Sequence, residues 1–369
     1  MDEKRACIAL SIASGLGPVG VGHLLEIYGT ARSVLKAAAR GLPDNIGLNK
    51  GQYAALSDVG LLTDRADKEM RRLEECGGEA VVFSDDAYPD LLAESYNPPF
   101  VLYTCGDRSL LSRPSVAVIG SRAATKYGRR AAFSISAGLA ERGVAVVSGL
   151  AAGIDAEAHS GCLYGRGKTI AVLGCGLDTV YPRSNQKLYM EIADKGLLVS
   201  EYPLGTKPEP FRFPARNRII AGLSLGVVVV EAARKSGSLI TVQYALDEGR
   251  EVFAVPGQID SVKSTGTHWL LQQGAFLVQS ADDIVTHLQI GTAAMDGQSS
   301  LSLDAIDLDP VSKRIFAAIE NYPVSRDQLL DVVELSPAEL SKHLLLLEIE
   351  GFIEMLPGDE VRRIGSDSH

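Results

Sequence analysis

Val116-Ala117-Val118-Ile119-Gly120-Ser121-Arg122 places four apolar residues, three of them β-branched, directly before a glycine turn. Such a run is typical of a buried parallel strand, and a helical segment, 126–142, follows the turn. Ligands of open α/β sheets bind at strand-to-helix turns of this kind. Gly120 lets a backbone approach closely, while Ser121 and Arg122 offer a hydroxyl and a planar fork that suits phosphate. The residues suggest an anion site, although a glycine turn with a surface arginine explains the tripeptide equally well.

The same alternation of strand and helix extends over residues 78–289. Apolar strands separated by helices of this length indicate an α/β fold with a parallel, doubly wound sheet. The predicted strands are 80–83, 101–103, 115–119, 144–148, 169–173, 197–199, 226–230, 251–255 and 275–278. The predicted helices between them are 126–142, 153–164, 184–195, 214–222, 238–248 and 266–273.

The two ends of the chain have different patterns. Residues 1–72 are predicted to form a helical domain of the SAM/helix-hairpin-helix type, because Gly15-Leu16-Gly17-Pro18 resembles a helix-hairpin-helix turn. Amides of such a turn can contact a DNA phosphate, but few basic residues flank it, so packing is the favoured role. Residues 290–304 are rich in Gly, Ser, Thr and Ala and are predicted to be a flexible linker. Residues 305–369 read as three helices and a hairpin, which is the pattern of a winged-helix domain.

The charge of the chain is uneven. A net charge of −10 over 369 residues argues against a protein that coats nucleic acid along its whole surface. Yet segments 121–130 and 211–218 contain bases and no acid, whereas 320–360 holds ten acids and two bases. An acidic protein with basic islands can hold a focused anion site.

Composition also bears on location and on metals. The chain has no apolar run of about 18 residues and no signal-like N-terminus, so no membrane association is expected. The five cysteines are scattered, which favours a reducing cytoplasm and gives no zinc or disulfide pattern.

The motifs of enzymes and cofactor sites fail one by one. Gly165-Arg166-Gly167-Lys168-Thr169 resembles the end of a P-loop, but Cys162 replaces its first glycine and the segment precedes a strand instead of following one. Gly174-Cys175-Gly176 lacks the third glycine of a dinucleotide fingerprint, because Thr179 stands there. No hydrolase elbow is present. We therefore expect no catalysis, no cofactor and no metal.

What remains is a set of polar residues that suit phosphate. Ser236-Gly237-Ser238 opens a helix after the strand that ends at Glu231, and free amides there, with two hydroxyls, would favour an anion. For either serine alone, helix capping is the better explanation. We expect this turn to cluster, on one edge of one sheet, with the other candidates, which are Arg122, Lys168, Arg216, Asn217 and Arg218.

These motifs together resemble the DNA-processing protein DprA (Smf) family. The likeness covers nearly the whole chain and is most specific over 115–285. The matching segments are 118–122, 148–156 with His159, 168–176, Tyr181-Pro182, 213–224, 236–241 and 255–257. One departure is Gly266-Thr267-His268, where the family usually has Gly-x-Asn, and this leaves the role of His268 open.

The resemblance implies a non-enzymatic protein that binds single-stranded DNA. Such proteins protect incoming strands during natural transformation and load RecA recombinase onto them, and they act as homodimers of an extended Rossmann-like domain. The implied basic pocket uses Arg122 and Lys168, with Arg216, Asn217 and Arg218 on the same side. The glycine and serine turns complete the expected DNA-binding set with Gly120, Ser121, Gly149, Gly153, Ser236, Gly237 and Ser238.

Two other functions compete with this one. A nucleotide hydrolase of the lysine-decarboxylase-like phosphoribohydrolase type would carry Pro-Gly-Gly-x-Gly-Thr and a following glutamate, and segment 234–241 has neither. A transcription regulator would read DNA with its winged helix. The expected recognition helix, however, is mainly acidic and carries Glu339, Lys342, His343, Glu348 and Glu350. Phosphates would repel such a helix, so this module is expected to bind protein or to pack.

Overall fold

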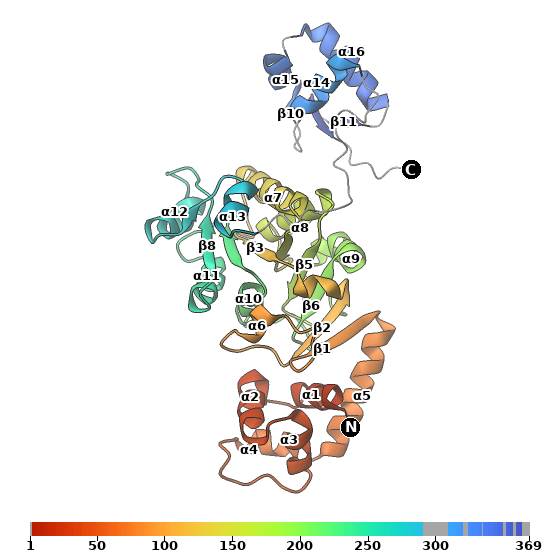
Figure 1. Ribbon diagram of the computed structural model, residues 1–369, viewed down its shortest axis with the longest axis vertical. Helices are drawn as coiled ribbons and strands as arrows, with labels where there is room; N and C mark the ends of the chain where they lie inside the picture. The colour runs from red at the N-terminus through yellow and green to blue at the C-terminus, as the bar shows by residue number, and fades with distance from the viewer. Residues whose placement is uncertain are drawn as a thin grey trace. The chain divides into compact units, whose positions relative to one another are not determined.

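The computed structural model describes residues 2–290, 309–319, 324–333, 335–349, 352–356 and 359–363. These belong to two compact units, residues 1–291 and 292–369 (Figure 1). From residue 291 onward the predicted linker lies outside the described residues.

The first unit is built on a nine-stranded sheet in the order β1-β2-β6-β5-β4-β3-β7-β8-β9. β2 runs antiparallel to β1 and to β6, and every other pair is parallel. The predicted α/β doubly wound fold is confirmed, with β2 as the reversed strand. The strands are β1 (Gly78–Val82), β2 (Val101–Gly106), β3 (Ser115–Ile119), β4 (Ala145–Ser148), β5 (Thr169–Leu173), β6 (Leu197–Ser200), β7 (Gly226–Val229), β8 (Glu251–Ala254) and β9 (Phe276–Leu277).

Strand order changes direction at β3. The chain adds β4, β5 and β6 on one side of β3, and then returns to add β7, β8 and β9 on the other. The two halves of a doubly wound sheet diverge at such a point, and a crevice opens there at the carboxyl ends of the strands.

Helices cover both faces of the sheet, because its central strands carry apolar side chains on both faces. In β3, Val116 and Val118 pack with α7, α8 and α13, whereas Ala117 and Ile119 pack with α10, α11 and α12. None of the described helices is both long and apolar enough to cross a membrane. The helices are α6 (Asp90–Ala93), α7 (Lys126–Glu141), α8 (Ile154–Tyr164), α9 (Gln186–Lys195), α10 (Arg212–Gly222), α11 (Ser238–Asp247), α12 (Thr265–Gln272) and α13 (Ala281–His287).

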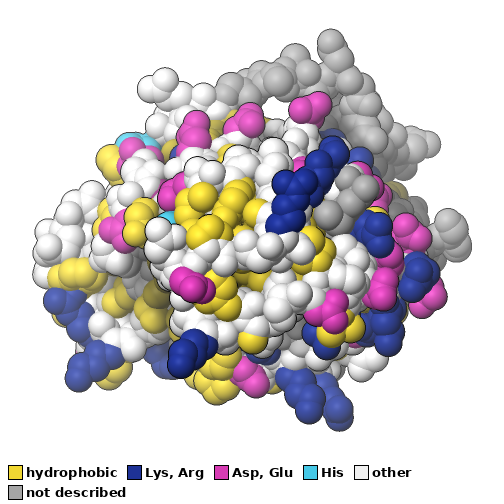
Figure 2. All heavy atoms as spheres, turned by 90° about the horizontal axis from the view of Figure 1, so that it is seen from below, with side chains coloured by type: hydrophobic (Ala, Val, Ile, Leu, Met, Phe, Trp, Pro, Cys, Tyr) yellow, Lys and Arg dark blue, Asp and Glu magenta, His cyan; other side chains and the backbone are white. Residues whose placement is uncertain are grey.

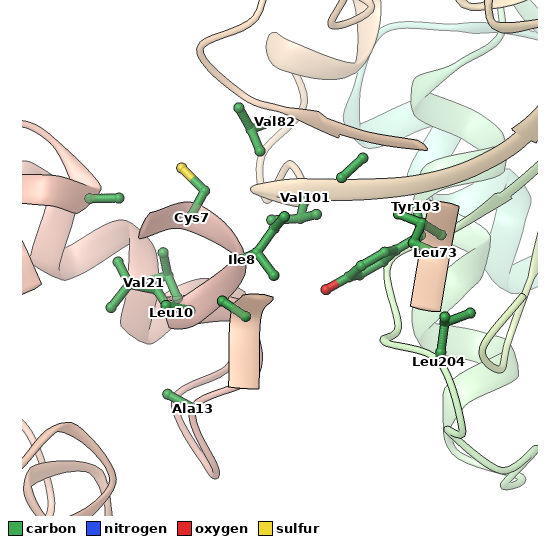
Figure 3. Packing of buried hydrophobic residues seen from close by; sticks show 14 of the residues in the cluster. Cys7, Ile8, Leu10, Ala13, Val21, Leu73, Val82, Val101, Tyr103 and Leu204 are labelled. Atoms are coloured by element: carbon green, nitrogen blue, oxygen red, sulfur yellow. The ribbon is translucent and has the colours of Figure 1, made fainter. Parts of the chain in front are cut away.

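Five N-terminal helices share a core with one end of this sheet. Ile8 of α1 faces Tyr103 of β2, and Leu204, which follows β6, lies beyond Tyr103 in the same buried cluster (Figure 3). The Tyr103 hydroxyl lies 3.2 Å from the Ser11 hydroxyl. This shared core joins residues 1–72 and 78–289 into one compact unit. The helices are α1 (Glu3–Ser11), α2 (Gly17–Tyr28), α3 (Ala31–Ala38), α4 (Lys50–Leu56) and α5 (Val59–Glu75).

The second unit has the three helices and the hairpin of a winged helix. Leu340, Leu344 and Leu347 of α16 form its core with Ile315 and Val361. Its small sheet has the order β10-β12-β11, and β10 is a short strand that the sequence pattern did not indicate. The elements are α14 (Pro310–Ala318), β10 (Val324–Ser325), α15 (Arg326–Val333), α16 (Pro337–Ile349), β11 (Ile353–Leu356) and β12 (Glu360–Arg363).

Candidate functional site

A cavity of about 490 Å³ opens where the strand order changes direction, beyond the carboxyl ends of β3 and β7. We call it the central pocket. It brings together eight of the twelve predicted site residues, namely Gly120, Ser121, Arg122, Arg216, Asn217, Ser236, Gly237 and Ser238. Asp155, Tyr181 and Phe213 also line it. A smaller cavity of about 160 Å³ shares Arg122 and Phe213 with the central pocket and adds Gly149.

Arg122 is the exposed cation of the central pocket. Its guanidinium carbon lies 5.4 Å from the centre of the Phe213 ring, and Phe213 stacks on Tyr181 at 5.2 Å. Within the part of the chain that the structure describes, Arg122 has no ion-pair partner. An unneutralised guanidinium beside two aromatic rings can take both a phosphate and the face of a base.

Two glycines hold the Ser121–Arg122 turn against its neighbours. Gly153, at the start of α8, has φ of +84°, and a Cβ on it would overlap the carbonyl oxygens of Ser121 and Arg122. A Cβ on Gly120 would come within 2.9 Å of the Glu231 carbonyl oxygen. Gly153 therefore lets α8 start against the turn that carries Arg122, and Gly120 lets that turn approach the end of β7. A side chain at Gly153 would displace the Ser121–Arg122 backbone.

The turn that opens α11 contributes hydroxyls. The Ser236 and Ser238 hydroxyl oxygens lie 2.6 Å apart. The expected free amides are only partly present. The Ser238 amide donates to the Ser236 hydroxyl, and the amides of Leu239 and Ile240 donate to backbone carbonyls. Among the described residues the Gly237 amide has no hydrogen-bond partner, so this amide and the two hydroxyls are left to meet an anion.

Arg216 forms part of the pocket floor and is held there by the protein itself. Its guanidinium donates to the carbonyl oxygens of Gly149, at 2.8 Å, and Val172. Burial lowers its pKa to about 10, so the group stays charged at neutral pH. Asp155 lies beside it and accepts from the amides of Gly149 and Ala151, while burial raises the pKa of this carboxyl. Arg216 thus adds positive potential. Two of its five donors are used, both on Nη1, and its buried Nε has no hydrogen-bond partner among the described residues.

Arg218 does not belong to the pocket. It pairs with Glu201, and the two side chains are only 10% and 8% exposed. The expectation that all three members of Arg216-Asn217-Arg218 face the same ligand is wrong, because a helix turns adjacent residues in different directions. Asn217 faces the pocket and Arg218 faces the core.

Lys168 lies at the other end of the sheet. It directly precedes β5, where Thr169 pairs with Val146 near the start of β4, whereas Arg122 follows the end of the parallel strand β3. Its ammonium lies 3.8 Å from Asp107. The predicted common edge of Arg122 and Lys168 is therefore wrong, because residues before and after parallel strands lie at opposite ends.

Sequence reasoning missed three residues of this region. Phe213 and Tyr181 form the stacked pair, and Lys263 donates to the Ser121 hydroxyl at 3.2 Å. The sequence did carry a signal for Phe213, because Phe211 and Phe213 alternate with arginines in the basic segment 211–218. His268, the departure from the family pattern, lies 3.1 Å from the Gly257 carbonyl oxygen and does not line the central pocket.

The acids near the pocket have structural partners. Glu231 accepts from the Thr125 amide at 2.9 Å and from the Thr125 hydroxyl. Among the described residues, no three His, Cys, Asp or Glu side chains are placed to hold a metal ion. The pocket therefore combines an exposed cation, hydroxyls and an aromatic stack.

Comparison with known proteins gives consistent matches. A family described as DNA recombination-mediator protein A matches residues 79–289, and the DprA winged helix domain matches 301–359. Protein Smf of Synechocystis sp. is 36% identical over 402 residues, which cover 98% of this chain and 99% of that protein. The DNA processing protein DprA of Streptococcus pneumoniae is 49% identical over 205 residues, which cover 56% of this chain and 72% of that protein.

Two solved structures are similar to this one. The X-ray structure of DprA from S. pneumoniae has a TM-score of 0.69 at 39% identity, covering 78% of this chain and 98% of that one. DNA processing protein A from Helicobacter pylori, known for a single-stranded DNA binding mode, has a TM-score of 0.53 at 32% identity. That match covers 58% of this chain and 96% of the other.

Proposed function

The chain belongs to the DNA recombination-mediator protein A (DprA/Smf) family, and from that premise we propose that it binds single-stranded DNA in the central pocket without chemical turnover. The similar protein of H. pylori binds single-stranded DNA. The observation that carries the proposal is the unneutralised Arg122 beside the Phe213–Tyr181 stack.

This combination suits an unpaired strand better than a duplex. Single-strand binders join a cationic track for the backbone with aromatic rings on which exposed bases stack. Tyr181 is 41% exposed and Phe213 lies beneath it, so a base can stack only when it is free of a partner strand. The hydroxyls of Ser236 and Ser238 line the same cavity and can hydrogen-bond a phosphate of that strand.

The alternative, a nucleotide hydrolase, needs a carboxylate that can act as a general base. Asp155 is tied to two backbone amides and Glu231 to Thr125. Their engagement supports binding without catalysis.

RecA loading and a homodimer through the Rossmann-like domain complete the proposal. RecA loading follows from family membership. For the dimer, β9 is an edge strand that pairs with β8 alone among the described strands, and its Phe276 and Leu277 are 42% and 54% exposed. An apolar strand edge is a template for pairing with a second chain, so this edge is our choice for the dimer contact.

A salt titration tests the central claim. Fluorescence anisotropy with a labelled poly-dT oligonucleotide and with the matching duplex should show tighter binding of the single strand. Its affinity should fall with salt, with a log–log slope of about −0.7 per phosphate neutralised. Nucleotide hydrolysis measured on the same preparation should stay at background. If the protein hydrolyses a nucleotide robustly, and Asp155→Asn or Glu231→Gln abolishes that activity, the hydrolase alternative is correct and the proposed function is wrong.

A further inference from the structure

A second basic cavity lies between the N-terminal helices and the sheet. It has a volume of about 420 Å³ and is lined by Ser11–Ser14, Arg65, Lys68, Glu69, Arg72 and Pro203. We call it the α5 groove. Three of its four charged residues are cations, and they lie on one face of α5 because positions three and four apart on a helix are neighbours.

Two of these cations are free to meet a ligand. Arg72 is paired with Asp178 at 3.1 Å and with Glu69 at 3.7 Å, so its charge is compensated. Glu69 also accepts from the Leu204 amide. Arg65 and Lys68 are exposed, and in the described part of the chain neither has a hydrogen-bond or ion-pair partner.

The positive charge here is local. Figure 2 views the molecule from below. On this face Lys and Arg side chains lie scattered among acidic ones and form no continuous positively charged surface. The other acids of this part of α5 are Asp64 and Asp67, which do not line the groove, and Asp67 pairs with Arg5. The α5 groove therefore concentrates positive charge on an acidic protein.

Two chain segments connect the α5 groove to the central pocket. Asp178, which holds Arg72, is three residues from Tyr181 of the central pocket, so their Cα atoms are at most about 11 Å apart. Pro203 of the groove and Phe213 of the pocket belong to the second segment. Within that segment Arg212 lies over the Tyr202 ring at 5.3 Å. One cation and one ring therefore lie on the segment between the two sites, and Arg212 is also paired with Glu209 at 3.3 Å.

We propose that the α5 groove is a second phosphate-binding site, on which single-stranded DNA leaving the central pocket continues over Arg65 and Lys68. This inference rests on the proposed function, since it extends the path of the same strand. It gives the N-terminal helices a binding role beside packing, and it predicts that a long strand binds more tightly than one that fills only the central pocket.

The test compares two oligonucleotide lengths on the full chain. Wild type, Arg122→Ala and the double variant Arg65→Ala/Lys68→Ala are titrated with poly-dT of about 6 and about 40 nucleotides. The double variant should lose roughly 5- to 20-fold in affinity for the long strand and keep wild-type affinity for the short one. Its salt slope on the long strand should be shallower by about 1.4, because two phosphates lose their partners.

Matched variants control for net charge and for folding. Arg32→Ala/Arg40→Ala removes two exposed cations from the same helical domain outside the groove, and should bind both lengths as wild type does. The variant Arg65→Lys/Lys68→Arg keeps both positive charges and should bind the long strand as tightly as the wild type does.

The possible failures are distinguishable. If Arg122→Ala weakens binding of both lengths while Arg65→Ala/Lys68→Ala matches its control, the second site is refuted and the proposed function stands. If Arg122→Ala binds both lengths as wild type does, the proposed function fails together with this extension.

Discussion

Arg122→Ala should weaken binding of single-stranded DNA, whereas Lys168→Ala should not. The two residues were equal candidates in sequence, and they lie at opposite ends of parallel strands. Arg122 is exposed in the central pocket, 5.4 Å from the Phe213 ring, while Lys168 lies 3.8 Å from Asp107. The pair therefore separates a site contact from a general effect of positive charge.

The size of the loss follows from what Arg122 can contribute. A charge-assisted hydrogen bond to phosphate adds about 1.5–3 kcal/mol. The contact between the guanidinium and the Phe213 ring is already made in the free protein, so it adds little to binding. Since no internal ion pair of Arg122 has to be broken among the described residues, we expect a loss of about 1.5–3 kcal/mol. This corresponds to roughly 10- to 150-fold in Kd. Lys168→Ala should stay within about twofold of wild type.

Anisotropy titrations over several salt concentrations measure both quantities. The slope for Arg122→Ala should be shallower by about 0.7, as one phosphate contact is lost. Circular dichroism and thermal melting check that each variant is folded. Wild-type affinity for folded Arg122→Ala, or an equal loss for Lys168→Ala, would refute the assignment of the central pocket.

Four further predictions concern stability and the second unit. Gly153→Ala should destabilise the fold by about 1–3 kcal/mol in urea unfolding, because of its φ of +84° and the carbonyls of the Ser121–Arg122 turn. Gly237→Ala, with open space and negative φ, should cost under about 1 kcal/mol and serves as its control. Arg218→Ala should lower the free energy of unfolding by about 3–5 kcal/mol, because it leaves Glu201 buried without its ion-pair partner. The double variant Arg218→Met/Glu201→Leu should recover most of that stability. If it does not, the ion pair itself is required. Burial raises the pKa of Glu248 to about 7, above its ordinary value, so its stabilisation is complete below about pH 4.5 and is lost as pH rises through 7. Because Glu248 is only half-buried, solvent screening reduces this loss, and urea unfolding should show about 1–2 kcal/mol of it between pH 5 and 8. An unchanged pH profile in Glu248→Gln would exclude Glu248 as its source. Deleting residues 305–369 should leave single-strand affinity within a few fold, because segment 320–360 is strongly acidic; a large loss would give the winged helix a direct DNA contact.

The strands were predictable because burial of a strand is visible in its own residues, without knowledge of its neighbours. β3, β5 and β7 are covered on both faces, so each appears in sequence as an unbroken apolar run. The reversed direction of β2 was not predictable in this way. Its partner β6 lies about ninety residues further along the chain, and an apolar run has the same composition in either direction.

The site residues were predictable where the role of a residue follows from the strand-to-helix turn in which it lies. Gly120, Ser121 and Arg122 follow β3, and the switch in strand order brings them to the turn before α11. Arg218 required knowledge of a distant partner, Glu201, to be excluded. The placement of Lys168 needed only the chain direction, because a residue before a parallel strand cannot share an edge with one that follows its neighbour.

The number of free cations limits how this acidic chain can hold a strand. Arg216 lines the central pocket but is bound to carbonyls. The two proposals therefore use Arg122 in the pocket, Lys263 beside it, and Arg65 and Lys68 in the α5 groove. Four phosphate contacts correspond to a salt slope of about −2.8 on single strands. Affinity beyond these contacts has to come from stacking on Tyr181 and Phe213, which salt screens little. A slope much steeper than −3 would therefore require further cations, from exposed residues of this unit that flank the pocket, such as Lys235 and Arg183, from a second copy of the chain, or from the winged-helix unit. Repeating the titration with Lys235→Ala/Arg183→Ala and with residues 305–369 deleted separates these sources.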